Sequence, residues 1–365
     1  VALWYYDNLP QDDPYPAMPF SRAQISGYLN DNSELTPGEV KHKQRLVWCI
    51  NAGMVLVEAL YARPLMNEVL PRVTNYAGGK TPGYIRRKLR SWKHWYWVCL
   101  DYSAYDSTVP KWLIKDVFEL IKAKFDASQH AILDWICYHF IHTKIYMPDG
   151  SVKQKCKGIP SGSYFTQIIG TLINLVVIRT YMIKLKGKDN VDRFMTENGE
   201  YTFMAMGDDN ILFTPFEINR KHLSKWIKEK FGLDVNEAKC EHGDPDSDPV
   251  FLKRAWQRDG EWRNPLELLI NMCTPEYFRD YDGKGFKPAH VLYGYWLTYK
   301  NALRPFFKHK DIVKLIKAGG GAEKMLILPD RALPGSLYAL KLTNPSLFKS
   351  LVREVMRDEA KLAVV

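Results

Sequence analysis

The spacing of apolar and polar residues changes several times along the chain, and each spacing predicts a different element. The run WYWVCL at 95–100 is apolar without interruption, which is typical of a short strand buried on both faces. From 110 to 125 the apolar residues fall on one helical face, and Pro110 suits the first turn of a helix. Residues 163–185 are apolar nearly all round, which predicts a helix buried in the core.

The segments between these landmarks complete the predicted order. Residues 41–66 begin basic and continue as an amphipathic helix, whereas 1–40 are rich in proline and predict an irregular, extended arm. Apolar runs at 201–206 and 211–213 predict two strands on either side of a tight turn. The remaining predictions are a basic helix within 76–94, a helix at 128–141, a hairpin at 144–155 turning at 148–150, a helix at 221–231, a hairpin at 251–263 turning at Asp259-Gly260, and mainly helical chain from about 265. This order predicts an α+β domain followed by a helical C-terminal domain.

Composition indicates a globular chain with a basic surface. Hydrophobic residues form 46% and charged residues 25% of the 365 residues, so we expect a packed core. The net charge of +10 favours a polyanionic partner, although many basic enzymes bind no nucleic acid. The six cysteines include no Cys-x-x-Cys pair, so they are interpreted as reduced thiols and a zinc site is not expected.

The sequence shows no targeting or membrane segment. We find no apolar run of membrane-span length, and the first residues lack the basic region of a secretory leader. No membrane partner is therefore expected. Because the chain starts with Val1, we expect it to be a fragment of a longer protein.

Two aspartates follow the predicted central strand in the segment LDYSAYDST. The strand delivers Asp101 to a surface, and Asp106 lies five residues further along. A buried strand holds a metal ligand with little freedom, and two magnesium ions about 3.5–4 Å apart can clamp the attacking and leaving oxygens of nucleotidyl transfer. The alternative is a strand that ends in an ordinary turn, with Ser103, Asp106 and Ser107 as turn and cap residues.

A second pair of carboxylates and a glycine-rich loop extend this pattern. Asp208 and Asp209 stand at the predicted tip between two strands, where adjacent like charges are unfavourable without a cation. The alternative is an ordinary Gly-Asp-Asp-Asn turn. The loop KGIPSGSYFTQ, at 157–167, opens the buried helix, and a helix N-terminus with free N–H groups attracts phosphate. For this loop the alternative is a connection with an N-cap.

Together and in this order, the three segments resemble the motifs of viral RNA-dependent RNA polymerases. LDYSAYDST is similar to motif A, GIPSGSYFTQ to motif B and MGDDN to motif C. Together with KHKQRLVW near the start, these motif sequences most resemble those of double-stranded RNA viruses of the picobirnavirus and partitivirus type. The resemblance covers roughly residues 41–265. The resemblance implies an α+β, right-hand polymerase with an antiparallel-sheet palm, partial fingers and a mainly helical thumb. The implied subdomains are fingers at 1–94 and 111–153, palm at 95–110 and 154–264, and thumb at 265–365.

The resemblance also implies a role for each matching residue. Asp101, Asp208 and Asp209 would hold two Mg²⁺ ions, with Mn²⁺ as the alternative metal. Asp106 would accept a hydrogen bond from the ribose 2′-hydroxyl, directly or through Ser161, and a site built for a hydroxyl rejects the analogue that lacks it. The other implied nucleotide contacts are Lys43, Arg45, Gly162, Thr166 and Asn174, of which the first two face the triphosphate.

Some of these roles have plain alternatives. Asn174 stands eight residues after Thr166, where single-stranded RNA members of the family place an asparagine after four, so its alternative is a buried amide bonded to backbone. Lys239, in GLDVNEAK, is similar to the general acid of motif D, or is a surface lysine after a turn. The implied RNA contacts are Arg254 in FLKR, for the product strand, and Arg86, Arg87 and Lys88, for the template, with a solvated basic helix as the alternative for the last three.

The activity implied is template-directed RNA synthesis from ribonucleoside triphosphates, for viral genome replication and transcription. RNA template and product would be its partners, with viral capsid protein as a further candidate, in the host cytoplasm and packaged within the virion. A reverse transcriptase shares the palm but usually carries an aromatic residue where Asp106 stands, with Tyr105 next to it here. A non-catalytic RNA-binding or capsid-associated protein on a degenerate palm is the second rival, which the three retained aspartates argue against.

Overall fold

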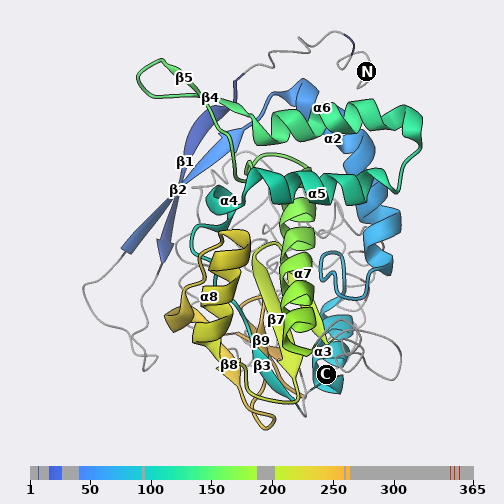
Figure 1. The fold of residues 1–365 in the computed structure, drawn as a ribbon, viewed down its shortest axis with the longest axis vertical. Coiled ribbons are helices and arrows are strands. Elements are labelled where there is room, and N and C mark those ends of the chain that lie inside the picture. Colours follow the sequence, from blue (N-terminus) through green and yellow to red (C-terminus); the bar gives the residue numbers. More distant parts are fainter. Residues whose placement is uncertain are drawn as a thin grey trace, which may run out of the picture. The chain divides into compact units, whose positions relative to one another are not determined.

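A computed structural model describes most of the chain between residues 16 and 263 (Figure 1). The described residues are 7, 16–26, 41–92, 95–186, 202–258 and 260–263, with 346, 349 and 353 as isolated positions. The chain divides into two compact units, 1–21 with 45–256, and 22–44 with 257–365. The four-stranded sheet and the helices described below lie in the first unit. The thumb predicted at 265–365 lies outside the described residues apart from the three isolated positions, and the other subdomain boundaries stay predictions.

A four-stranded antiparallel sheet forms the centre of the first unit. Its order is β6 (Phe203–Met206), β7 (Asp209–Thr214), β3 (Tyr96–Val98) and β8 (His242–Gly243). The first two strands form a hairpin whose last pair is Met206 with Asp209, so Gly207 and Asp208 make a two-residue turn. Gly207 has a φ of +64°, a left-handed conformation that glycine adopts without a steric penalty.

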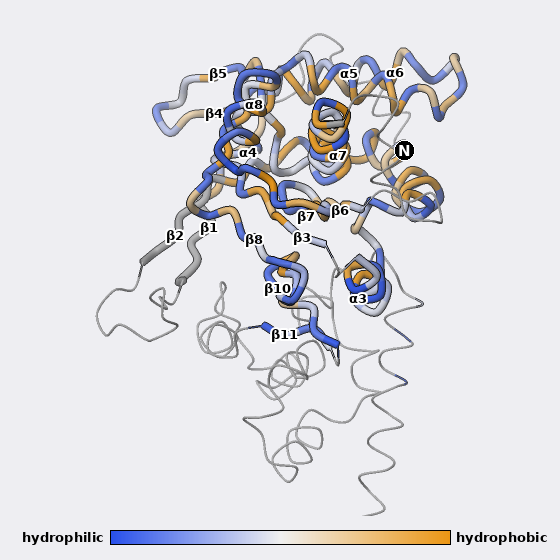
Figure 2. The backbone as a smooth tube through the Cα atoms, turned by 60° about the horizontal axis from the view of Figure 1, so that its bottom comes forward, coloured by the Kyte–Doolittle hydropathy of each residue, from blue (hydrophilic) through white to orange (hydrophobic). Residues whose placement is uncertain are grey.

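The two faces of this sheet are covered by different elements, and both are buried. Figure 2 shows helices α5 (Lys111–Lys122), α6 (His130–Ile141), α7 (Phe165–Lys186) and α8 (Arg220–Phe231) on one side, and α3 (Pro82–Ser91) with β10 (Arg254–Trp256) on the other. Alternate strand residues therefore enter separate cores. Those of the first core are Val98, Phe203 and Leu212, and those of the second are Trp97, Met204, Ile211 and Phe213. Burial on both faces explains why the strand sequences are apolar without alternation.

Helix α7 is the axis of the larger core. Its buried residues include Phe165, Ile169, Ile173 and Val177, all fully inaccessible to solvent, and it packs against α5 and β6. The segment Phe165–Leu185 is also long and apolar enough to cross a membrane, which corrects the expectation that no run reaches that length. Its most apolar window is 56% buried inside the protein, as in a core helix of a globular fold.

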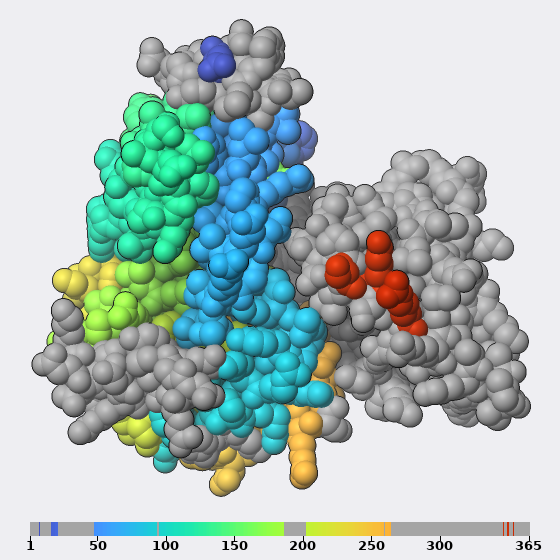
Figure 3. Space-filling view, turned by 90° about the vertical axis from the view of Figure 1, so that its right-hand side faces the viewer, coloured from blue at the N-terminus to red at the C-terminus, as the bar shows by residue number. Residues whose placement is uncertain are grey.

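The helices begin where the sequence supplies caps. α2 (Ala52–Pro64) starts after Asn51, whose side chain accepts a hydrogen bond from the Gly53 N–H, and it continues into the π-turn η1 (Leu65–Val69) and the 3₁₀ turn η2 (Leu70–Arg72). α3 starts after Thr81, which caps Tyr84, with Pro82 in the first turn. Figure 3 shows the face on which the chain from α2 to α3 is exposed.

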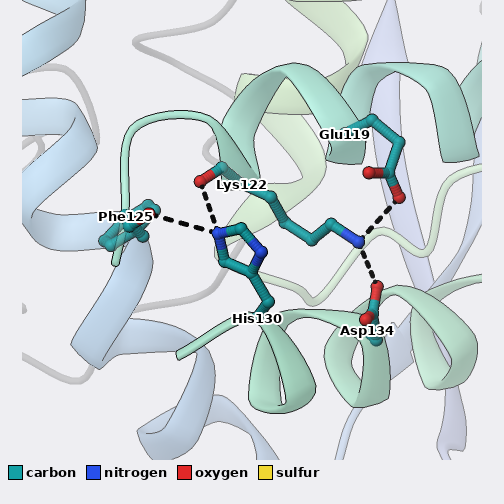
Figure 4. A network of polar contacts seen from close by, with 5 residues as sticks. All are labelled: Glu119, Lys122, Phe125, His130 and Asp134. Atoms are coloured by element: carbon teal, nitrogen blue, oxygen red, sulfur yellow. Dashed lines mark hydrogen bonds and ion pairs between the residues drawn. The ribbon is translucent and has the colours of Figure 1, made fainter. Parts of the chain in front are cut away.

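The connection between α5 and α6 is fixed by polar contacts (Figure 4). The short turn η3 (Ala127–Gln129) precedes α6, and the His130 Nε2 atom lies 3.0 Å from the Lys122 carbonyl oxygen and 3.1 Å from that of Phe125. Lys122 also pairs with Glu119 at 2.8 Å and Asp134 at 2.7 Å. Both carboxylates are more than half exposed, so we expect each surface pair to contribute at most about 1 kcal/mol.

Two segments differ from the sequence prediction near the N-terminus. Met18–Ser26 forms strand β1 within the predicted irregular arm, and Lys41–Cys49 forms strand β2 where the start of a helix was predicted. The two strands make a two-stranded sheet. The prediction of a helix over 41–66 is wrong for residues 41–49. The N-cap at Asn51 starts α2 only at Ala52, and the residues before it form hydrogen bonds with β1 instead.

The last hairpins also differ from prediction. β9 (Val250–Phe251) pairs with β10 in the register Phe251 with Arg254, so the first turn lies at Leu252-Lys253, while β11 (Glu261–Trp262) follows the second turn. Leu252 and Lys253, the residues of the first turn, each have a φ of +56°, which is strained for non-glycine residues. Neither residue type signals such a turn, so it cannot be recognised from the sequence. The hairpin predicted at 148–150 is confirmed between β4 (Lys144–Tyr146) and β5 (Val152–Gln154). The remaining elements are α4 (Tyr105–Thr108) and η5 (Glu237–Lys239).

Candidate active site

The sheet brings the predicted carboxylates to one edge. β3 and β7 pair as far as Val98 with Leu212; the chain then runs three residues further to Asp101, while β7 begins three residues before Leu212, at Asp209. The strand contact beyond Val98 is completed by the buried side chain of Asn210. Its Oδ1 atom accepts from the Leu100 N–H at 3.1 Å, and its Nδ2 atom donates to the Leu100 carbonyl at 3.3 Å. One asparagine thus holds the residue before Asp101 beside the carboxylates of the next strand.

The charges at this edge interact. Partial burial raises the pKa of Asp209 to about 6, the negative charges of Asp208, Glu241 and Asp101 add to the rise, and the Lys253 ammonium opposes it. Burial, together with the charge of Asp101, likewise raises the pKa of Glu241, and Lys253 lowers it. The sequence analysis missed Glu241 and Lys253. Glu241 follows the predicted motif D, and its backbone bond to Cys99 places it beside the strand that delivers Asp101.

This edge has the donor chemistry that a divalent cation needs. Asp101, Asp208 and Asp209 offer hard carboxylate oxygens, and the pKa of Asp209 is raised first by burial and then by neighbouring negative charges, which a cation would neutralise. Across the described part of the chain, no group of three or more His, Cys, Asp or Glu side chains is arranged to hold a metal ion. The carboxylate ligands and their combined negative charge fit a divalent metal ion. Coordination of the metal by all three aspartates stays a prediction.

The turn that carries Asp208 rests on helix α7. The Gly207 N–H donates to the Thr171 hydroxyl at 2.7 Å, and the Asn174 amide donates to the carbonyls of Gly207 at 3.1 Å and Asp208 at 3.0 Å. Asn174 also accepts from the Tyr102 hydroxyl at 3.2 Å. Asn174 is fully buried, so the structure shows the buried, backbone-bonded alternative rather than an amide open to a nucleotide. Its contacts join the turn to the chain just after Asp101.

Asp106 reaches the surface through a short, sharply turned segment. Ala104 has a φ of +51°, and the single turn α4 that follows exposes Asp106 while it buries Tyr105. The Tyr105 hydroxyl donates to the Gly170 carbonyl of α7 at 2.7 Å. The aromatic ring beside Asp106 therefore points into the core, away from the surface on which Asp106 is exposed.

The glycine-rich loop is pressed between two other segments. The Gly158 N–H donates to the Val109 carbonyl at 2.8 Å, and a Cβ at Gly158 would lie 2.6 Å from the Asp106 carbonyl oxygen. A Cβ at Gly162 would overlap the Trp48 carbonyl oxygen, at the end of β2. Backbone atoms cannot yield as a flexible side chain can, so only glycine fits at both positions. Ser161 between them is exposed.

Comparison with known proteins decides the family. The sequence model described as "Viral RNA-dependent RNA polymerase" matches residues 34–281, more than half of the chain. The chain belongs to this family. The prediction from the three motifs is thereby confirmed.

The relatives of this polymerase family member include double-stranded RNA virus proteins. It is 29% identical over 209 residues to the RNA-directed RNA polymerase of Cryptosporidium parvum virus 1 (strain KSU-1), covering 54% of this chain and 37% of the relative. It is 31% identical over 181 residues to the genome polyprotein of Human enterovirus 70 (strain J670/71), covering 48% of this chain and 7% of the polyprotein. The chain thus spans well under half the length of these relatives.

Solved structures show the same fold. The RNA-dependent RNA polymerase of a human picobirnavirus matches with a TM-score of 0.64 and 17% identity, over 92% of this chain and 61% of that one. An insertion-loop deletion mutant of it matches with a TM-score of 0.63 and 17% identity, over 93% and 63%. The α+β polymerase fold predicted from sequence is confirmed.

The other residues predicted to bind nucleotide or RNA lie in helices and strands described above. Thr166, at the start of α7, donates its hydroxyl to the Pro160 carbonyl within the loop. Lys239 is exposed at the end of η5, and Arg254 is half-buried at the start of β10. Lys43 and Arg45 fall on β2, but their side chains lie outside the described part of the chain.

The predicted template-binding residues lie on α3. Arg87 is exposed, and Arg86 and Lys88 are half-buried, while Ile85 and Leu89 turn into the smaller core. The Lys88 ammonium lies 5.8 Å from the centre of the Tyr84 ring, which is a typical cation–π contact. These positions fit either a solvated basic face or an RNA contact, so the predicted role stays open.

Proposed function

We propose that this polymerase family member synthesises RNA on an RNA template from ribonucleoside triphosphates. The observation that supports the proposal is the antiparallel pairing of β3 and β7, which brings the chain leading to Asp101 beside the start of β7, where Asp209 begins the strand and Asp208 lies on the adjoining turn. The buried Asn210 side chain holds Leu100, the residue before Asp101, beside the strand that begins with Asp209. Acidic groups from neighbouring chain segments are what nucleotidyl transfer requires, since together they could hold metal ions at the reaction centre.

The residues take the following parts in the proposed reaction. Asp101, Asp208 and Asp209 would hold two Mg²⁺ or Mn²⁺ ions, which when bound neutralise charge on the reacting phosphate and favour ionisation of the attacking 3′-hydroxyl. Asp106 and Ser161 would bind the ribose 2′-hydroxyl, because the bond from Ile159 N–H to the Asp106 carbonyl joins the loop to α4. Lys239, on an exposed turn, would give a proton to the leaving pyrophosphate.

The basic residues complete the proposal. Lys43 and Arg45 would bind the triphosphate, Arg254 the product strand, and α3 the template, consistent with a net charge of +10. We further propose that the activity serves genome replication and transcription of a double-stranded RNA virus, in the host cytoplasm and within the virion, with capsid protein as a partner. The family of the chain and its likeness to a viral RNA-directed RNA polymerase support RNA synthesis as the activity on which this setting rests.

An extension assay tests the function. Purified protein is given a defined RNA template, with and without a primer, labelled ribonucleotides and Mg²⁺. The variant Asp208→Asn should lose incorporation by several orders of magnitude while RNA binding is retained. The control Asp126→Asn changes an exposed aspartate before α6 and should behave as wild type. Incorporation by Asp208→Asn at the wild-type rate, or equal use of deoxyribonucleotides, would refute the assignment.

A further inference from the structure

A fully buried carboxylate lies outside the described catalytic residues. Glu58, on α2, has no solvent-accessible surface. Its Oε1 atom accepts a hydrogen bond from the Ser163 hydroxyl at 2.8 Å, and its Oε2 atom accepts from the Tyr164 N–H at 2.9 Å. The Ser163 hydroxyl oxygen in turn accepts from the Phe165 N–H at 3.0 Å. One side chain from α2 thus satisfies the N-terminal end of α7, over a hundred residues away in sequence.

Fold stability alone does not account for this arrangement. Burial raises the pKa of Glu58 to about 7, and the bonds from Ser163 and Tyr164 only partly offset that rise. Among the described residues Glu58 has no charged partner, and a buried carboxylate in that situation is a costly core residue, whereas a helix N-terminus is satisfied equally well by an exposed serine or aspartate. The buried acid therefore fits a role in fixing geometry better than a role in holding the core together.

The segment that Glu58 holds is the end of the glycine-rich loop. Ser161 and Gly162 precede Ser163 directly, and Gly162 is pressed against the Trp48 carbonyl at the end of β2. The other end of the loop is also held, because the Lys155 ammonium donates to the Gly158 carbonyl at 2.6 Å. Ser161 and Gly162 are thus exposed residues between two fixed ends of the loop, and Glu58 holds the nearer end, at Ser163 and Tyr164.

We propose that Glu58 is a positioning residue that holds Ser161 and Gly162 where the loop meets the sugar of the incoming nucleotide. The inference rests on the proposed function, and it adds the element that sets the loop: helix α2, which starts three residues after β2 ends. Both neighbours of the sugar would then be placed from the core, Asp106 through Tyr105 and α7, and Ser161 through Glu58.

The matched pair Glu58→Gln and Glu68→Gln tests this. A glutamine side chain has the shape of glutamate but no charge and only one acceptor oxygen, so in Glu58→Gln the oxygen can accept from the Tyr164 N–H, while the amide nitrogen can only donate to the Ser163 oxygen; that bond is reversed, and both bonds lose the strength that the carboxylate charge gave them. Glu68 is exposed in η1, so the same chemical change there is a control. For Glu58→Gln we expect the KM for ribonucleotides to rise about tenfold, with a similar fall in the preference for ribo- over deoxyribonucleotides and no change in RNA affinity. A tenfold change is what the loss of about one hydrogen bond to a charged group would cause.

A structural measurement separates this inference from the proposed function. Hydrogen exchange at the Tyr164 and Phe165 amides should be faster in Glu58→Gln than in wild type and unchanged in Glu68→Gln. Should Glu58→Gln fail to fold, Ser163→Ala removes the bond from Ser163 to Glu58 together with the one that Ser163 accepts from the Phe165 N–H, and it should give a kinetic change in the same direction. Wild-type KM and sugar preference in a folded Glu58→Gln protein overturn the inference, as does unchanged exchange. An inactive wild-type protein with the expected exchange result refutes the proposed function instead.

Discussion

Replacing Glu58 with glutamine should remove a specific pH dependence of stability. The pKa of the buried Glu58 is raised from an ordinary 4.5 to about 7 by burial. A group with a raised pKa binds more protons in the folded state than in the unfolded state between these values. Its contribution to stability is therefore fully present below about pH 4.5, and it is lost as the pH rises toward 7.

The size of the effect follows from the shift. Each tenfold change in proton affinity is worth about 1.4 kcal/mol, so the whole rise corresponds to roughly 3 kcal/mol. Wild type should lose about this much free energy of unfolding relative to Glu58→Gln between about pH 4.5 and 7.5. Other titrating groups, including Asp209 with its pKa of about 6, are common to both proteins and cancel in the difference.

Chemical denaturation at several pH values measures this difference. Urea unfolding of both proteins, followed by tryptophan fluorescence, gives the free energy of unfolding at each pH. The difference between the two proteins should change steadily over the window and become flat above it. Parallel pH profiles for wild type and Glu58→Gln would show that Glu58 does not titrate in a buried site, and the reasoning about its role would fail with them.

Three further substitutions test the supports of the site. Gly162→Ala places a Cβ against the Trp48 carbonyl oxygen. We therefore expect the free energy of unfolding, measured by thermal unfolding, to fall by about 1–3 kcal/mol, and nucleotide incorporation to fall sharply. A variant as stable and as active as wild type would contradict the close contact. Asn210→Ala removes both bonds to Leu100, and it should lower kcat with little change in RNA affinity; an unchanged kcat would refute the clamp. Asn174→Ser should lower kcat while it preserves the preference for ribonucleotides, because Asn174 holds the turn at Asp208; a loss of that preference would restore the predicted sugar contact.

Local pattern predicted most of the central elements. The unbroken run at 95–100 and the paired runs around Gly207 form adjacent strands, and the apolar segment after 163 forms the central helix α7. Strands β1 and β2 were missed because their sequences do not alternate clearly between apolar and polar residues. The two strands also pair with each other, and local sequence does not reveal that pairing. The turn at Leu252-Lys253 was missed because neither residue type signals a positive φ.

The site shows the same division. Acidic residues at strand ends are visible in the sequence because the strands that carry them are local patterns. Their supports are not, since Glu58 meets Ser163 across 105 residues and Asn210 meets Leu100 across 110. Glu241 and Lys253 likewise join the site only through the folding of the sheet. Sequence motifs therefore identified the groups proposed to do chemistry, and the structure was needed for the groups that place them.

The central claim is that aspartates from two separate strands converge on divalent cations. It is tested most directly by a crystal structure grown with Mn²⁺, in which anomalous scattering locates each ion. We expect ions bound by the carboxylates of Asp101 and Asp208, with Asp209 adjoining, and loss of that signal in Asp208→Asn. Manganese bound elsewhere, or a signal that survives this substitution unchanged, would contradict it.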